Sequence, residues 1–382
     1  MDFSLAEEQR MIQEMARDFA TEVLAPVAPI IDQTEEYPFE NCRQMGELGL
    51  MGVEVPEEYG GTGADTVSYV IAVEEVSKAC GATGTVMSVN NSLVCHGLVL
   101  HGTPEQREKY LRPAAVFERI GAFCLSEPHA GSDASSQRTR AVRDGDYYVV
   151  NGAKNFITSG GVADFHIVFC TTDPEAVPKH HGISCLLIDA DTPGFLPGKP
   201  EEKLGIRASN TAALTLEDCR VPVSNRLGAE GQGFRIAMEV LDAGRIGIAA
   251  QALGIAQAAF EASSAYALER EQFEKLLAQH QAIQFMIADM ATRIEAARLL
   301  TFKAALKKQR KERYTLEAAM AKLYASETAT WVTNKAVQIH GGYGYVREYN
   351  VERYFRDAKI TEIYEGTSEV QRIVISRRLL RD

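Results

Sequence analysis

The chain lacks a hydrophobic run long enough to cross a bilayer, and it lacks an excess of positive charge. Its longest uncharged apolar stretch, residues 246–260, is rich in Gly, Ala and Gln and is too short for a span. The 40 Lys and Arg residues are outnumbered by 52 Asp and Glu, which gives a net charge of -12. We therefore expect no nucleic-acid partner and no stable membrane insertion.

Paired cysteines and an N-terminal targeting segment are also missing. The seven cysteines are scattered and form no Cys-x-x-Cys pair, which favours reduced thiols in a cytosol-like compartment. The start of the chain, residues 1–8, is acidic and polar and shows no signal or transit peptide. We expect a bacterial cytoplasmic protein, or a mitochondrial matrix protein if the sequence is a mature processed form.

Several common catalytic motifs are absent. The sequence contains no Gly-x-Gly-x-x-Gly, P-loop, Gly-x-Ser-x-Gly or His-Glu-x-x-His. The missing dinucleotide fingerprint argues against a Rossmann oxidoreductase, although a flavin could be bound in another way. The eight histidines show no metal-ligand spacing, so we expect no metal site.

The residues that are present divide the chain into three parts. Residues 1–118 show helical periodicity, and residues 119–230 hold short apolar runs separated by Asp-Gly, Asn-Gly and Pro-Gly turns. No long helical pattern interrupts these runs, so we expect an antiparallel barrel or sandwich. Residues 231–382 are helical again, and the long periodic stretches 234–270 and 281–309 predict a bundle, often part of a subunit interface. The strand-like runs are 122–125, 147–150, 165–169, 183–188 and 213–216.

Glu365 lies in the run Ile-Tyr-Glu-Gly-Thr-Ser-Glu, just before a predicted helix. Ser368 and Gln371 have the spacing of a capping box for that helix. A carboxylate in an apolar turn beside a helix start has a raised pKa, and nearby amides can hold charge that develops on a substrate oxygen. Taken alone, the run fits a solvated loop and cap better, and the rest of the chain is what favours a catalytic carboxylate.

Three other segments have features of a site that contacts a flavin or a phosphate. Residues 123–133 carry hydroxyls and a glycine where a strand ends, residues 151–159 place an aromatic ring beside a hydroxyl, and residues 338–344 end a helix in a glycine cluster. A strand-end loop, ordinary strand packing and simple helix capping would each explain one of them.

Together with residues 242–247 and 361–369, and in this order, these motifs resemble the acyl-CoA dehydrogenase family over essentially the whole chain. The likeness is greatest to short-chain (butyryl-CoA) dehydrogenases, as seen in residues 89–93, 203–207 and 251–256. The resemblance implies a mainly α fold with a β-barrel middle domain between two helical domains. It also implies a homotetramer with FAD between the middle and C-terminal domains.

The resemblance further implies roles for individual residues. Glu365 is expected to be the catalytic base, and some relatives carry the base at the position of Gly244, where this chain has only a glycine. The expected FAD contacts within one subunit are Phe123, Leu125, Ser126, Gly131, Ser132, Phe156, Ile157, Thr158, Thr367, Ser368 and Glu369. The expected contacts with the FAD of a partner subunit are Arg270, Gln281, Gln338, Ile339, Gly341 and Gly342. The expected acyl-CoA contacts are Ser132, Asp242, Gly244, Arg245, Gln251, Thr361 and Gly366.

The implied reaction removes an α-proton and a β-hydride from a saturated acyl-CoA, as in fatty acid β-oxidation, and passes electrons to an electron-transfer flavoprotein. Gln251 and Thr361 match short-chain members and indicate a substrate of about four carbons. An oxidase that uses oxygen, and a non-catalytic acyl-CoA-binding or assembly protein, are the alternatives. The chain departs from the family after Arg270, where Glu274 and Leu276 replace a Gly and a Pro. We expect this loss of turn residues to permit more helix.

Overall fold

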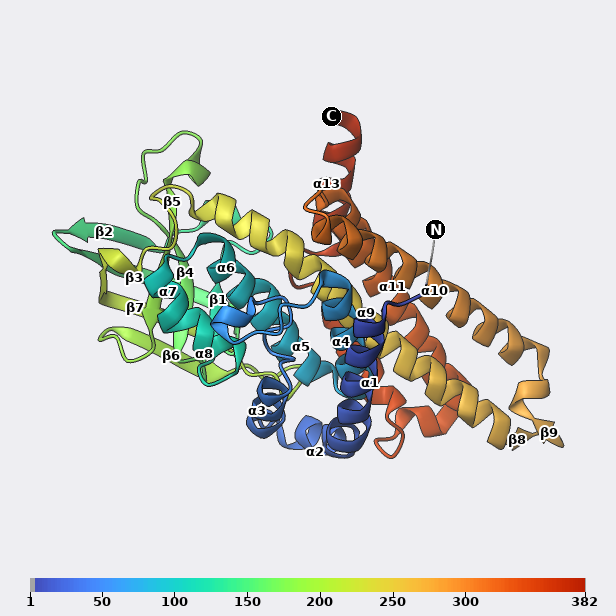
Figure 1. Cartoon of the computed structure of the whole chain (residues 1–382). Coiled ribbons are helices and arrows are strands. Elements are labelled where there is room, and N and C mark those ends of the chain that lie inside the picture. Colours follow the sequence, from blue (N-terminus) through green and yellow to red (C-terminus); the bar gives the residue numbers. More distant parts are fainter. Residues whose placement is uncertain (1–3, 382) are drawn as a thin grey trace.

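In Figure 1 the helices from the two ends of the chain pack together, and the curled sheet formed by the middle of the chain lies at one side of them. The computed structural model describes residues 4–381. The first group of helices is α1 (Glu7–Phe19), α2 (Ala25–Thr34), α3 (Phe39–Glu47), α4 (Thr66–Ala79), α5 (Gly81–Val89), α6 (His96–His101), α7 (Pro104–Gln106) and α8 (Arg112–Ala115). The strands of the sheet are β1 (Gly121–Cys124), β2 (Arg140–Asp144), β3 (Tyr147–Thr158), β4 (Phe165–Thr171), β5 (Ile183–Asp189), β6 (Phe195–Pro200) and β7 (Thr211–Pro222). The last group is α9 (Gly233–Glu269), α10 (Gln281–Gln309), α11 (Thr315–His340), α12 (Val351–Ala358) and α13 (Ser368–Arg381).

The sheet is mixed, so the expectation of a purely antiparallel barrel is wrong in one respect. Its order is β1-β4-β2-β3-β7-β6, with β5 on the other side of β4. Strand β1 runs parallel to β4, and the antiparallel β2–β3 hairpin lies between these two strands in the chain. Apolar patterning reports burial and carries no information on strand direction.

Two strands have no clear pattern in the sequence. Strand β2 is mostly exposed and carries Arg140, Arg143 and Asp144, so it lacks an apolar run. Strand β6 contains two prolines and a glycine, and these residues favour the prediction of a turn over that of a strand. Among the strands of residues 4–381, β6 pairs with β7 alone and therefore forms an edge, where proline is tolerated.

The long helix α9 connects the sheet to the C-terminal bundle and positions the site described below. It packs against α4 and α5 on one side and against α10 and α11 on the other. Small residues let these helices approach closely: a Cβ added at Gly254 would lie 2.3 Å from the Glu74 carbonyl oxygen of α4. In the yellow part of Figure 1, α9 runs from the sheet into the bundle, and its buried face belongs to the core of both.

The segment after α9 corrects the expectation of more helix near Glu274. Helix α9 ends at Glu269, and residues 271–272 (β8) and 275–276 (β9) pair as a small hairpin. Phe273 and Glu274 form its turn with φ angles of 55° and 60°. Pairing of the two short strands maintains the reversal of chain direction, although the turn lacks the glycine that usually occupies it.

The seven cysteines are all buried and unpaired. Between residues 4 and 381, no helix is both long and apolar enough to cross a membrane.

Candidate active site

Glu365 occupies a tight turn between a short 3₁₀ segment (Lys359–Glu362) and α13. Glu365 and Gly366 both have left-handed backbones, with φ of 51° and 94°. A left-handed glutamate is strained, and such strain is typical of functional sites when the surroundings hold it in place. Here the side-chain amide of Gln371 donates to the carbonyl oxygens of Glu365 (3.3 Å) and Gly366 (2.9 Å).

The expected capping box between Ser368 and Gln371 is wrong. Thr367 caps α13, because its hydroxyl accepts the Val370 N–H at 3.3 Å. Ser368 is the first helical residue, and its buried hydroxyl has no hydrogen-bond partner in the part of the chain that the structure describes. Gln371 instead fastens the turn that holds Glu365, as described above.

The Glu365 carboxylate is shielded from solvent and unpaired. Both of its oxygens are buried, and neither has a hydrogen-bond partner among residues 4–381. Burial raises the pKa of Glu365 to about 7, while the positive charges of Lys322 and Arg245 act in the opposite direction. Within the same residues, nothing accepts a hydrogen bond from the Glu365 backbone N–H. The turn therefore presents a desolvated base and a free donor side by side.

Lys322 is the cation behind this turn. Its side chain is fully buried on α11, and its ammonium donates to the Gly366 carbonyl oxygen at 2.7 Å. Burial lowers the pKa of Lys322 to about 8, and the neighbouring Glu365 partly offsets this effect. The lysine thus fixes the turn and supplies positive charge close to the carboxylate.

Helix α9 contributes Asp242, Gly244 and Arg245 to the site. A Cβ added at Gly244 would lie 2.0 Å from the nearer Glu365 carboxylate oxygen and 2.8 Å from Leu93 Cδ2. The base therefore packs directly on the bare backbone of α9. Arg245, which is 5% exposed, donates to Asp242, and Asp242 also accepts the Thr315 hydroxyl at 2.5 Å.

Gln251 lies about two helical turns beyond Gly244 on α9, in a hydrogen-bond network that includes Tyr364, the residue before Glu365. Its side-chain amide donates to the Gly81 carbonyl oxygen (3.0 Å) and the Thr85 hydroxyl (2.7 Å), and its oxygen accepts the Tyr364 hydroxyl. Thr361 is also fully buried, and its hydroxyl donates to the Ala358 carbonyl oxygen at 2.7 Å. These polar groups are satisfied internally, so Gln251 fills volume next to the turn without leaving polar groups unpaired.

The first two cofactor motifs lie next to each other at the ends of β1 and β3. The Asn155 N–H donates to the Ser126 carbonyl oxygen at 2.9 Å, and Leu125 and Ile157 are buried. Phe123 and Leu125 belong to the same apolar cluster as Leu93, whose Cδ2 lies 2.8 Å from a Cβ added at Gly244. Ser132 is exposed, and Thr158 is half-buried at the end of β3.

Two residues of these motifs are open to solvent or to a ligand. The ring of Phe156 is 67% exposed. No atom lies within 4 Å of a Cβ added at Gly131, so a ligand could approach the backbone closely there. Glu369 is exposed in the first turn of α13, beside the capping residue Thr367.

The third motif does not join the site around Glu365. Gln338 follows Lys322 along α11 by about 24 Å of helix. The Arg270 guanidinium lies 5.5 Å above the ring of Tyr343, and the Leu277 N–H donates to the Arg270 carbonyl oxygen at 2.8 Å. We use the name distal cluster for the residues expected at the FAD of a partner subunit, which are Arg270, Gln281, Gln338, Ile339, Gly341 and Gly342. Added Cβ atoms at its two glycines would again meet open space.

Two helical groups and a curled sheet, with a buried unpaired carboxylate held between α9 and the turn before α13, are typical of an enzyme that carries out proton transfer. Family models for the acyl-CoA dehydrogenase N-terminal, middle and C-terminal domains match residues 6–118, 122–219 and 231–380. The chain therefore belongs to the acyl-CoA dehydrogenase family. Members are FAD-dependent flavoproteins, and FAD is the cofactor of this enzyme.

Individual relatives are similar over their full length. The chain is 54% identical to the short-chain specific acyl-CoA dehydrogenase of Clostridium acetobutylicum, with 100% of both chains covered. The butyryl-CoA dehydrogenase of Megasphaera elsdenii has a similar structure, with a TM-score of 0.97, 47% identity and 100% of both chains covered. A structure described as the electron transferring flavoprotein of Acidaminococcus fermentans matches with a TM-score of 0.98 and 52% identity, again over 100% of both chains.

Sequence reasoning missed Lys322 and the partners of Gln251. A signal for Lys322 exists, because it has helical spacing with Ala318, Ala325 and Ala329 on the buried face of α11. A lone lysine on an apolar face needs a partner. Nothing in the sequence indicates that Tyr364 and Thr85 meet Gln251, since these three residues come from separate elements.

Proposed function

We propose that the protein oxidises a short-chain saturated acyl-CoA to the trans-2-enoyl-CoA, with Glu365 as the base that takes the α-proton. The observation that carries this proposal is the buried Glu365 carboxylate, which has no hydrogen-bond partner in residues 4–381 and a pKa raised to about 7. A base works best when its pKa is near the operating pH. A solvated loop carboxylate, the plain alternative, would have neither property.

The turn assists proton removal in two ways. A thioester α-proton is a weak acid, so the carbonyl oxygen needs a donor where negative charge develops, and the free Glu365 N–H is such a donor. Lys322 and Gln371 hold the Gly366 carbonyl, which keeps the carboxylate and the N–H in one arrangement. Bound FAD supplies the acceptor for the hydride. The absence of a side chain at Gly244 leaves room for the carboxylate against α9.

Residues around the turn would hold the acyl-CoA. Asp242 and Arg245 form a buried pair on α9, and we assign them, with Ser132, Gly244 and Gly366, to substrate contacts. Gln251 and Thr361 fill the space beyond the base, and a filled floor excludes extra methylenes. The relatives described as short-chain specific and as butyryl-CoA dehydrogenase support a preference for about four carbons.

The remaining partner assignments rest on the same family. The residues that we assign to the FAD of the same subunit are Phe123, Leu125, Ser126, Gly131, Phe156, Ile157, Thr158 and residues 367–369. We assign the distal cluster to the FAD of a partner subunit in a homotetramer.

An apolar stripe along α10 suits a subunit interface. It consists of the exposed residues Phe285, Leu299 and Leu306, which are separated by multiples of seven residues. The domain limits 1–118, 119–230 and 231–382 belong to the same proposal. An electron-transfer flavoprotein is the proposed acceptor, supported by the relative from Acidaminococcus fermentans.

The test is a set of initial rates with acyl-CoA substrates of four to sixteen carbons. The proposal predicts the highest kcat/KM with butyryl-CoA and electron transfer to an electron-transfer flavoprotein with little hydrogen peroxide. A maximum at long chains would reject the short-chain assignment. Stoichiometric hydrogen peroxide in air would favour the oxidase alternative. Light scattering of the FAD-loaded protein tests the tetramer directly.

A further inference from the structure

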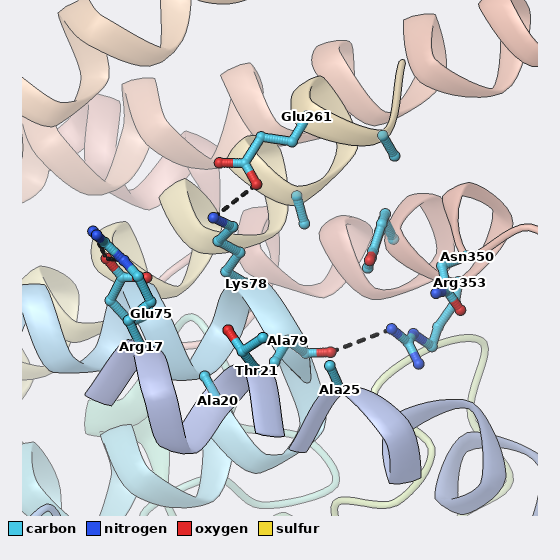
Figure 2. Close-up of a pocket in the computed structure, with 13 residues that line it drawn as sticks. Arg17, Ala20, Thr21, Ala25, Glu75, Lys78, Ala79, Glu261, Asn350 and Arg353 are labelled. Carbon is cyan, nitrogen blue, oxygen red and sulfur yellow. Dashed lines mark hydrogen bonds and ion pairs between the residues drawn. The ribbon is translucent and has the colours of Figure 1, made fainter. Parts of the chain in front are cut away.

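A cavity lies away from Glu365, where α1, α4, α9 and α12 meet. Its volume is about 340 Å³, and it shares no lining residue with the site described above. Figure 2 shows its charged lining residues. They comprise three cations, Arg17, Lys78 and Arg353, and two carboxylates, Glu75 and Glu261.

Two of the three cations are neutralised by the two carboxylates. Arg17 pairs with Glu75 at 2.7 Å, and Lys78 pairs with Glu261 at 2.7 Å, as the dashed lines of Figure 2 indicate. The charge of Arg353 is therefore left over in the lining. A small cavity with one uncompensated cation favours an anionic occupant.

Arg353 is buried and incompletely bonded. Its side chain is 5% exposed, and it makes one hydrogen bond, from Nη2 to the Ala79 carbonyl oxygen at 3.2 Å. Its Nε and Nη1 atoms are buried and have no hydrogen-bond partner within residues 4–381. A buried guanidinium is costly unless an acceptor satisfies its N–H groups. Asn350 and the ring of Tyr354, 5.2 Å from the guanidinium, complete this side of the cavity.

Asp357, the next acidic residue along α12, does not replace the missing partner. Asp357 lies one turn after Arg353 on α12, but its Oδ1 accepts the backbone N–H of Ile206 at 2.5 Å. Burial raises the pKa of Asp357 to about 6, with Arg353 acting against this only in part. A carboxylate fully paired with an arginine would have a lowered pKa.

We propose that this cavity binds a small oxyanion, a phosphate or a carboxylate, whose oxygens accept the free N–H groups of Arg353. The volume is at the lower end of that found for small-molecule sites. Helix α12 leads directly through residues 359–364 to Glu365, so an anion held here ties α1 and α4 to the segment that carries the base. The inference does not depend on the proposed acyl-CoA chemistry.

The test is titration of the FAD-loaded protein with inorganic phosphate and, separately, with acetate, at an ionic strength kept constant with chloride. Calorimetry and thermal denaturation are compared for wild type, Arg353→Met and Arg143→Met, the last being a control at an exposed position on β2. We expect a saturable signal of one site per chain for at least one oxyanion in wild type and Arg143→Met. Arg353→Met should weaken this binding by roughly 10-fold to 100-fold. The midpoint of wild type should rise by roughly 2 °C at saturation.

The ligand-free proteins give a second readout. Without added oxyanion, Arg353→Met should be at least as stable as wild type, because it removes a buried unpaired charge. If that variant does not fold, Arg353→Lys keeps the charge and should bind more weakly than wild type. Responses that do not saturate, or equal responses in wild type and Arg353→Met, would mean that the cavity holds only water and would overturn the proposal. Bleaching of the flavin by butyryl-CoA should survive in Arg353→Met, so failure of this site and failure of the proposed function are separable.

Discussion

Substituting Gly244 by alanine is the sharpest steric test of where the base lies. The new Cβ would be 2.0 Å from the nearer Glu365 oxygen, whereas ordinary contacts of a Cβ begin at 3.4 Å, so the carboxylate must move by roughly 1.4 Å. A displacement of about 1 Å in a reacting group costs roughly 100-fold in rate. Alanine is the better helix former by about 1 kcal/mol, so α9 itself should not be weakened.

The assay is steady-state oxidation of butyryl-CoA by protein with a full complement of FAD. We expect kcat of Gly244→Ala to fall by about 100-fold, with the flavin still bound, because the clash is with the carboxylate and the end of the Leu93 side chain. Gly97→Ala is the matched control: it is also a buried helical glycine, but its added Cβ would be in ordinary contact, 3.4 Å from Val240 Cγ2. A Gly244→Ala enzyme with a kcat near that of Gly97→Ala would refute the placement of the base against α9.

Three further predictions concern charge and volume around the turn. The folded-state pKa of Glu365, about 7, exceeds its unfolded value of 4.5, so its burial is destabilising above pH 7 and without effect below pH 4.5. Glu365→Gln should accordingly raise the free energy of unfolding by up to about 3 kcal/mol at pH 8, and removal of the charge should give no gain at pH 4. Denaturant titration at the two pH values measures this difference. An equal gain at both pH values would contradict the raised pKa of Glu365. Lys322→Met removes a cation that lowers the pKa of Glu365, so the acid limb of the pH profile of kcat/KM should move upward by about one unit, and an unmoved limb would exclude this role for the lysine. Gln251→Ala should raise the rate with hexanoyl-CoA relative to butyryl-CoA, and an unchanged ratio would reject Gln251 as a limit on chain length.

The long helices could be predicted from the sequence because their signal is local, whereas the proposal of Glu365 as the base rests on the resemblance that several separated motifs carry together. Periodicity over 234–270 and 281–309 matches α9 and α10 within one residue at each end. The raised pKa of Glu365 follows from an apolar turn before a helix, and the structure confirms that direction. Close packing also explains why glycine at 244 suits a neighbouring carboxylate, although only the structure shows the contact.

What could not be predicted depends on contacts between distant segments. Strand β1 pairs in parallel with β4, which lies 44 positions further along the chain. The prolines of edge strand β6 remove the sequence pattern by which a strand is predicted. Lys322 meets the Gly366 carbonyl across a similar separation in sequence. The hairpin at Phe273 and Glu274 kept its turn because strand pairing overrode the loss of a turn-forming glycine.

The most direct test of the central claim is the visible spectrum of the purified protein before and after anaerobic addition of butyryl-CoA, for wild type and Glu365→Gln. The account predicts a yellow wild type that bleaches and a yellow Glu365→Gln protein that does not, because the flavin is bound in both and only the base is missing. Bleaching of Glu365→Gln at the wild-type rate would contradict the assignment of Glu365 as the base.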